Sequence, residues 1–206
     1  MAAAGKVLTG FSKPYVALYG ESGGVVSYSS GQVLARGVSV SVSPEGAEDA
    51  NNFYADNVLA ESVQGGRFTG GTVTLTVDGL LAAAEKLVYG LPTASSLTVG
   101  ADTVSVYKYD DDADYPYCGV GWVTRYMSDG TEYFVGTVLK KVAFQPKGDE
   151  AATQEEDIDW QTQELTATIM RDDSAKHEWK EFTADLATEL AAENAVRVML
   201  GLAVLS

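Results

Sequence analysis

The chain of 206 residues carries 29 Asp and Glu against 14 Lys and Arg, which gives a net charge of -15. Proteins that bind nucleic acid or an anionic membrane gather basic side chains, so this composition argues against tight binding to either. Hydrophobic residues make up 46% of the chain, which is enough for a folded core, and the single cysteine cannot form an internal disulfide.

Two segments alternate with the period of two that is typical of half-buried strands. Residues 38–43 read Val-Ser-Val-Ser-Val-Ser, and residues 72–78 read Thr-Val-Thr-Leu-Thr-Val-Asp. In each segment the Val and Leu side chains are expected to pack in the core, and the small polar side chains are expected to form the opposite face. Weaker patterns predict further strands at 15–18, 25–29, 103–109, 118–126, 131–144 and 158–170.

Turn and capping signals complete the predicted elements. Residues 20–24 and 128–130 predict hairpin turns, because their glycines accept a positive φ. Helices are predicted at 80–89, before Gly90 and Pro92, and at about 189–200, after Thr188 as its N-cap.

The polar stretch 44–64 shows no regular pattern and is predicted to be a long loop between strands. Long loops inside compact domains are often functional. No internal repeat or linker divides the chain, so we predict a single domain over residues 1–206. Its class is mainly β (α+β), with a dominant antiparallel sheet and one or two flanking helices.

Several motifs resemble catalytic or binding sites without their required context. Residues 20–24 match the G-x-S-x-G string around Ser22, but a strand-like segment follows where a nucleophile elbow needs a helix. Gly65 and Gly70 have P-loop spacing, but Gly71-Thr72 stands where the lysine and hydroxyl residue should be.

Metal binding and nucleophilic catalysis have equally weak support. Asp110, Asp112 and Asp114 alternate as in a calcium loop, yet the glycine and the closing glutamate of that motif are missing. The only histidine is His177, and Cys118 has no nearby base. We therefore expect no enzymatic activity, no cofactor and no metal.

Three blocks of the sequence, taken together in their order and spacing, resemble the major tail protein family of long-tailed bacteriophages. The first block joins residues 38–43 to Tyr54-Ala55-Asp56-Asn57, and the second is residues 70–78. The third extends from Lys141 to Thr166 and includes residues 148–150, 153–154 and 160–165. It departs from the family where a glycine often follows the glutamate of the last strand, because this chain has Leu165 to Thr168 there.

The resemblance implies a β-sandwich or β-barrel of the tail-tube type, and copies that form hexameric rings stacked into a tube. Genome DNA would pass through this tube without specific binding. Further partners would be the tape measure, tail terminator and tail-tip proteins. The protein would be located in the virion tail, and in the bacterial host cytoplasm during assembly.

Two sets of candidate functional residues follow. The hydroxyl-rich strand faces predict a lumen lining, because a wall for DNA passage should not grip phosphate; the same pattern would also fit the outside of a tube. The long loop and the third block predict subunit contacts. The lumen candidates are Ser39, Ser41, Ser43, Thr72, Thr74, Thr76 and Asp78, and the interface candidates are Tyr54, Asp56, Asn57, Trp160 and Gln161.

Two other functions remain open on the sequence. A β-sandwich module of a phage particle that binds a receptor or carbohydrate would also be acidic and β-rich, and Tyr107, Tyr109, Tyr115 and Tyr117 could form its aromatic cluster. A hydrolase that uses Ser22 is the least supported alternative, because its motif lacks the expected helix.

Overall fold

The computed structural model describes residues 5–46, 50–64, 67–111, 113–146, 148–149, 151, 153 and 161–206; for residues 50–53 and 61–64 only the backbone is considered. The fold is mainly β, as the sequence predicts, and its dominant sheet is antiparallel. The strands of this sheet are β1 (Val7–Ser22), β2 (Val25–Val33), β3 (Gly37–Gly46), β6 (Phe68–Val77), β9 (Tyr117–Ser128), β10 (Thr131–Phe144), β11 (Gln163–Met170) and β12 (Lys180–Phe182).

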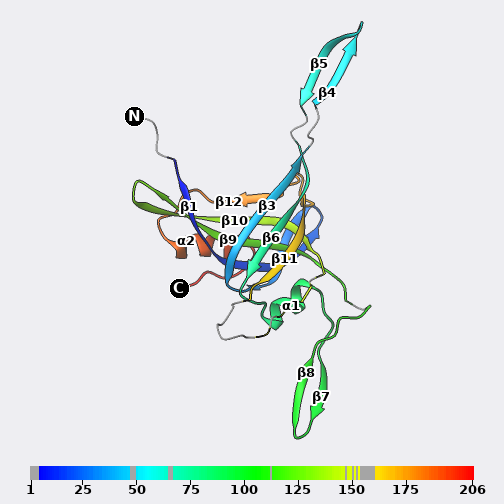
Figure 1. The fold of residues 1–206 in the computed structure, drawn as a ribbon, viewed down its shortest axis with the longest axis vertical. Helices are drawn as coiled ribbons and strands as arrows, with labels where there is room; N and C mark the ends of the chain where they lie inside the picture. The colour runs from blue at the N-terminus through cyan, green and yellow to red at the C-terminus, as the bar shows by residue number, and fades with distance from the viewer. Residues whose placement is uncertain are drawn as a thin grey trace.

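The main sheet follows the order β2-β1-β9-β10-β11-β6-β3, with β12 paired to β10. It does not close into a barrel, so β2 and β3 are its edge strands. The sheet curls, and the strands β3, β6 and β11 cross over β1, β9 and β10 (Figure 1). This curl creates an inner space between the two halves of one sheet.

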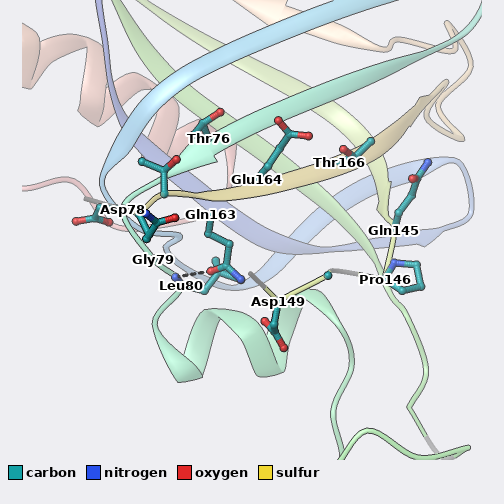
Figure 2. Close-up of a pocket in the computed structure, with 13 residues that line it drawn as sticks. Thr76, Asp78, Gly79, Leu80, Gln145, Pro146, Asp149, Gln163, Glu164 and Thr166 are labelled. Carbon is teal, nitrogen blue, oxygen red and sulfur yellow. Dashed lines mark hydrogen bonds between the residues drawn. The ribbon is translucent and has the colours of Figure 1, made fainter. Parts of the chain in front are cut away.

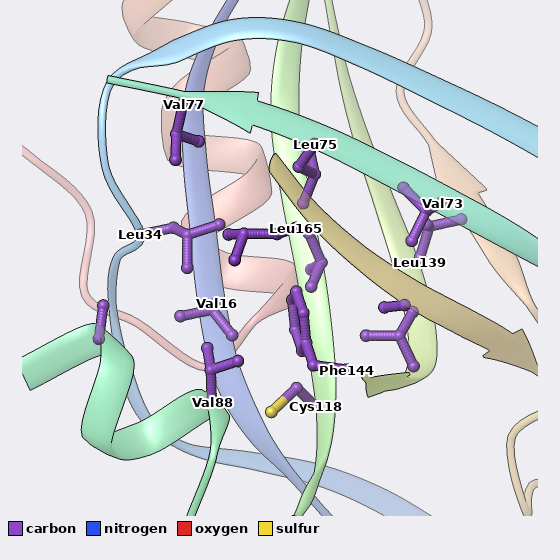
Figure 3. Close-up of a cluster of buried hydrophobic side chains, with 14 of the residues drawn as sticks. Val16, Leu34, Val73, Leu75, Val77, Val88, Cys118, Leu139, Phe144 and Leu165 are labelled. Atoms are coloured by element: carbon purple, nitrogen blue, oxygen red, sulfur yellow. The ribbon is translucent and has the colours of Figure 1, made fainter. Parts of the chain in front are cut away.

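Alternating apolar side chains fill that inner space. Leu75 of β6 and Leu165 of β11 face Val16 of β1 and Leu139 of β10 in one buried cluster (Figure 3). The helix α1 (Ala82–Val88) covers one end of the cluster with Val88. A core shared by both halves of the sheet explains why strands distant in sequence are held together.

The second helix, α2 (Glu189–Met199), packs on the opposite face of β1, β9 and β10. Thr188 caps it as predicted, because its hydroxyl accepts a hydrogen bond from the Ala191 amide at 3.2 Å. The helix lies close to the sheet because glycines face it: a Cβ at Gly121 would come within 2.7 Å of Val196. Adding a methyl group there would force apolar atoms into overlap, which typically costs about 1–3 kcal/mol.

Two hairpins leave the body of the molecule at opposite ends of its long axis (Figure 1). One is formed by β4 (Ala50–Ala55) and β5 (Val58–Gln64), and the other by β7 (Ser95–Val99) and β8 (Asp102–Val106). Each is a separate two-stranded sheet. We call them the β4–β5 arm and the β7–β8 arm.

The structure corrects three expectations from the sequence. Positions 44–64 are not an irregular loop, because they contain the end of β3 and the β4–β5 arm. Val38 does not face the core, because a shift in register between Gly37 and Ser39 leaves its side chain 54% exposed. The strand expected at 103–109 already ends at Val106.

Within the described residues, neither helix is long and apolar enough to span a bilayer.

Candidate functional site: the polar face of β3, β6 and β11

The alternating strands β3 and β6 pair so that their small polar side chains share one face of the sheet. Ser39 lies opposite Thr76, Ser41 opposite Thr74, and Ser43 opposite Thr72. The hydroxyl of Ser39 donates to that of Thr76 at 3.0 Å. Residues that alternate along paired strands line one face, so the antiparallel register brings six of the seven predicted lumen residues together.

The other side of the same strands belongs to the core. Val40 and Val42 pack against the buried cluster, and Val73 and Leu75 are fully buried within it. A shift of the register by one residue would expose these side chains and bury the hydroxyls. The burial of the apolar face therefore fixes which side chains the polar face presents.

Asp78, the seventh predicted lumen residue, lies just beyond the end of β6. Its carboxylate accepts a hydrogen bond from the Arg36 backbone amide at 2.9 Å, and its own amide donates to the Arg36 carbonyl at 3.0 Å. Asp78 thus closes the end of the β3–β6 pair. Its carboxylate also lies 3.8 Å from the Arg36 side chain.

The sequence analysis predicts the third strand of this face, within 158–170, but not that its polar side chains extend the face. In β11, Glu164 pairs with Thr76, Thr166 with Thr74, and Thr168 with Thr72. The alternation of Leu165, Ala167 and Ile169 with these polar residues was the available signal. We define the polar face as three rows of side chains across three strands: Ser39, Thr76 and Glu164; Ser41, Thr74 and Thr166; Ser43, Thr72 and Thr168.

A pocket of about 770 Å³ opens at one end of the polar face (Figure 2). Carboxylates from Asp78, Asp149 and Glu164 line it, and its described lining residues include no Lys, Arg or aromatic side chain. The amide oxygen of Gln163 accepts a hydrogen bond from the Leu80 backbone at 3.1 Å. The pocket is therefore polar and acidic, a poor environment for a phosphate group.

The predicted interface residues lie in separate places. Tyr54 is 62% exposed near the tip of the β4–β5 arm, and Asp56 and Asn57 form its turn with φ values of 52° and 63°. Gln161 lines the acidic pocket instead. Trp160 lies outside the described residues. The tip of the arm thus brings three of the five together.

The motifs that resemble catalytic sites have other roles in the fold. Ser22 ends β1, and Gly23 and Gly24 form a hairpin turn that leads directly into β2. Cys118 is fully buried, and burial raises the pKa of its thiol to about 12, so the reactive thiolate is disfavoured.

The remaining candidates show no assembled ligand set. His177 has a φ of 53° in a tight loop, and its ring Nδ1 lies 3.2 Å from the Asp172 carbonyl oxygen. In the part of the chain that the structure describes, no three His, Cys, Asp or Glu side chains are placed to hold a metal ion. Asp112 of the calcium-like pattern lies outside that part.

The four tyrosines considered for carbohydrate binding are exposed but do not line a pocket together. Tyr109 and Tyr115 each contact the ring of buried Tyr89, with centroids 6.0 and 5.9 Å away. Tyr109 also donates a hydrogen bond to Glu85 at 2.7 Å. These rings therefore pack beside α1 and the root of the β7–β8 arm.

No protein-family model matches the sequence, and no curated protein matches it with significance.

Proposed function

We propose that the chain is a structural subunit of a bacteriophage tail, whose copies form hexameric rings that stack into the tube for DNA passage. The observation that carries this proposal is the pair of arms at opposite ends of the molecule (Figure 1). Leu97, Val99 and Val104 are exposed on one arm, and Tyr54 and Val58 on the other. A two-stranded hairpin is marginal in water by itself, so apolar arms of this kind favour contacts with further copies.

The edges of the main sheet support ring formation. Both β2 and β3 present unpaired backbone groups, and an exposed edge readily pairs with another strand. Pairing of β3 in one copy with β2 in the next would extend the sheet around a closed ring. The curled, open sheet with its enclosed core is also in keeping with a β-sandwich of the tail-tube type.

We assign the polar face to the lumen. It presents hydroxyls and one carboxylate, and the described residues of the face include no cation. With a charge of -15 per chain, a ring of six copies would carry about -90, which repels DNA at long range. Passage without specific binding requires a wall of this kind, and no cofactor or catalytic group takes part in it.

The alternative of a carbohydrate-binding module has less support. Sugar sites combine polar groups with aromatic platforms, whereas the acidic pocket lacks a described aromatic lining residue. Two of the exposed tyrosines, Tyr109 and Tyr115, pack around Tyr89, and none of the four is among the described lining residues of that pocket.

Assembly of the purified protein tests the proposal. Concentrated protein should form rings or tubes in negative-stain micrographs, while dilute protein remains monomeric by light scattering. Replacing residues 95–106 by a short Gly-Ser linker should leave the body folded and abolish the tubes, because it removes the β7–β8 arm. A protein that stays monomeric at all concentrations and salt conditions, even with isolated tail tips as a template, would contradict the proposal.

A second experiment tests the lumen assignment. Thr74→Arg and Thr76→Arg would place a basic belt around every ring, so assembled tubes should bind short DNA at low salt and release it at high salt. Thr131→Arg, at an exposed position of β10, is the matched control. If tubes of all three variants bind DNA equally, the polar face does not line the lumen.

A further inference from the structure

A small pocket with unusual positive charge lies where the β4–β5 arm joins the body. It has a volume of about 350 Å³ and is formed at the start of β6 and just beyond the end of β11. Three of the 14 Lys and Arg residues of the chain contribute to it. We call it the cationic pocket, and its lining residues are Arg67, Phe68, Arg171, Lys176, His177 and Trp179.

The pocket is preformed by packing and hydrogen bonds. The rings of Phe68 and Trp179 stack with their centroids 4.3 Å apart and their planes within 6°. The guanidinium of Arg171 donates to the Phe68 carbonyl, which fixes the start of β6 to the loop after β11. An aromatic floor with cations around it suits a ligand that carries both carboxylates and aromatic groups.

The loop that supplies most of the pocket is held by a buried carboxylate. Asp172 is only 2% exposed, and its oxygen accepts hydrogen bonds from the amide and hydroxyl of Ser174 at 3.2 and 2.6 Å. Its backbone amide donates to the Glu178 carbonyl at 2.8 Å. The loop therefore presents its cations from a fixed framework.

The nearby carboxylates have other partners: lysines outside the pocket engage two of them, and Ser174 donates hydrogen bonds to the third, Asp172. Glu178 lies 3.4 Å from the Lys140 ammonium, and Asp173 lies 2.7 Å from that of Lys141. Among the described residues, Arg67 and Lys176 form no ion pair. In an acidic protein, this leaves a local positive site that a negative group can approach.

The same chain carries a fitting ligand near its other end. Asp110, Asp111 and Asp114 are exposed in a turn that follows the β7–β8 arm, with Tyr109 and Tyr115 beside them. The turn is closed by a hydrogen bond from the Ala113 amide to the Asp110 carbonyl at 3.1 Å. We call Asp110, Asp111 and Asp114 the acidic turn; with its neighbouring tyrosines it combines the carboxylates and aromatic groups that the cationic pocket suits.

We propose that the cationic pocket of one copy binds the acidic turn of the next copy. The pocket lies by the β4–β5 arm and the turn by the β7–β8 arm, and these arms lie at opposite ends of the molecule (Figure 1). The contact is therefore head-to-tail, and head-to-tail contacts that do not close propagate into a stack. This inference rests on the proposed tube and identifies the contact that joins successive rings.

Charge reversal tests the pairing. Arg67→Glu with Lys176→Glu in the pocket, or Asp111→Lys with Asp114→Lys in the turn, should each raise the concentration needed for tube assembly by about tenfold or more. A chain with all four substitutions should assemble near the wild-type concentration, because the opposite charges meet again. Arg171 is left unchanged because it holds β6 in place.

Controls separate a lost contact from lost folding. Glu21→Lys, near the end of β1, with Asp129→Lys, in the turn between β9 and β10, changes the net charge as much as the acidic-turn pair does and should leave assembly near wild type. Circular dichroism melts should be unchanged for every variant. Reversed chains that assemble as wild type does, or a fourfold variant that does not recover, would overturn the inference.

A peptide experiment distinguishes failure of this inference from failure of the proposed function. A synthetic peptide of residues 107–117 should quench the fluorescence of wild-type protein through Trp179 at low salt, and Arg67→Glu with Lys176→Glu should weaken its binding by about tenfold. This measurement uses dilute monomer and does not need tubes. No binding, or equal binding to a short DNA strand, would overturn the pocket assignment even if tubes form.

Discussion

The body of the molecule and its two arms differ in how far they bury their apolar side chains. In the body, alternating residues of β6 and β11 such as Leu75 and Leu165 are fully buried between the halves of the sheet. In β7, every residue is exposed, and Leu97 has 53% of its surface open to solvent. The body thus stabilises itself, whereas the described side chains of the arms belong to neither buried cluster.

The difference shows which part of the fold can be stable in a single copy. Hydrogen bonds alone hold the β7–β8 arm. A two-stranded hairpin has little stability without an apolar surface to cover it. A partner that covers Leu97 and Val99 would stabilise the arm by burying their area. In the proposed tube, the arms would complete their packing only in the assembled state.

The largest expected effect on the free energy of unfolding is seen when a Leu→Ala substitution in the body is compared with one in the β7–β8 arm. Leu75→Ala should lower the free energy of unfolding by about 2–5 kcal/mol, because it opens a cavity in the core. Leu97→Ala should change it by about 0.5 kcal/mol or less in the monomer, because the side chain is already exposed. Urea unfolding followed by tryptophan fluorescence measures both values.

In tube assembly, the variant in the β7–β8 arm should be the one with a clear effect. Leu97→Ala should raise the concentration needed for tubes, because the lost methyl groups belong to the contact between copies. A comparable loss of monomer stability in both variants would mean that the β7–β8 arm packs within its own chain.

The sequence predicted the body better than the arms for a physical reason. The alternation in 72–78 reports burial on one face, and β6 forms with that register because burial decides it. The same signal is present in β11. The strand predicted at 158–170 begins too early, because positions 161 and 162 precede β11, and positions 158–160 lie outside the described residues. The β4–β5 arm showed no periodic pattern in the sequence, and its described side chains, at positions 54–60, are exposed.

The functional sites, like the fold, could be predicted from the sequence only in part. Strand alternation identified the polar face, and antiparallel pairing then brought Ser41 and Thr74 together. The cationic pocket could not be found from spacing, because Arg67 and Lys176 are more than a hundred positions apart in sequence. The pairing of β6 with β11 brings their segments side by side.

A smaller effect should follow from raising the pH, and it should arise in the body alone. Burial raises the pKa of the Cys118 thiol to about 12 from an ordinary value of 9.0. In the unfolded chain the thiol ionises near pH 9, whereas the folded chain keeps its proton until about pH 12. The free energy of unfolding should therefore have its full value below pH 9 and fall as the pH rises towards 12.

At pH 10 the loss due to Cys118 alone should be on the order of 1 kcal/mol relative to pH 8. Burial also raises the pKa of Tyr28 and Tyr89, so these body residues should add to the loss above pH 10. Urea unfolding at pH 8 and pH 10 gives the difference, and Cys118→Ala should reduce it although that variant is less stable at both pH values. Because none of these groups lies in an arm, the variant with residues 95–106 replaced by a linker should lose the same free energy between the two pH values as the full chain. An equal pH dependence in the wild type and Cys118→Ala would mean that the buried thiol does not link proton binding to the stability of the body.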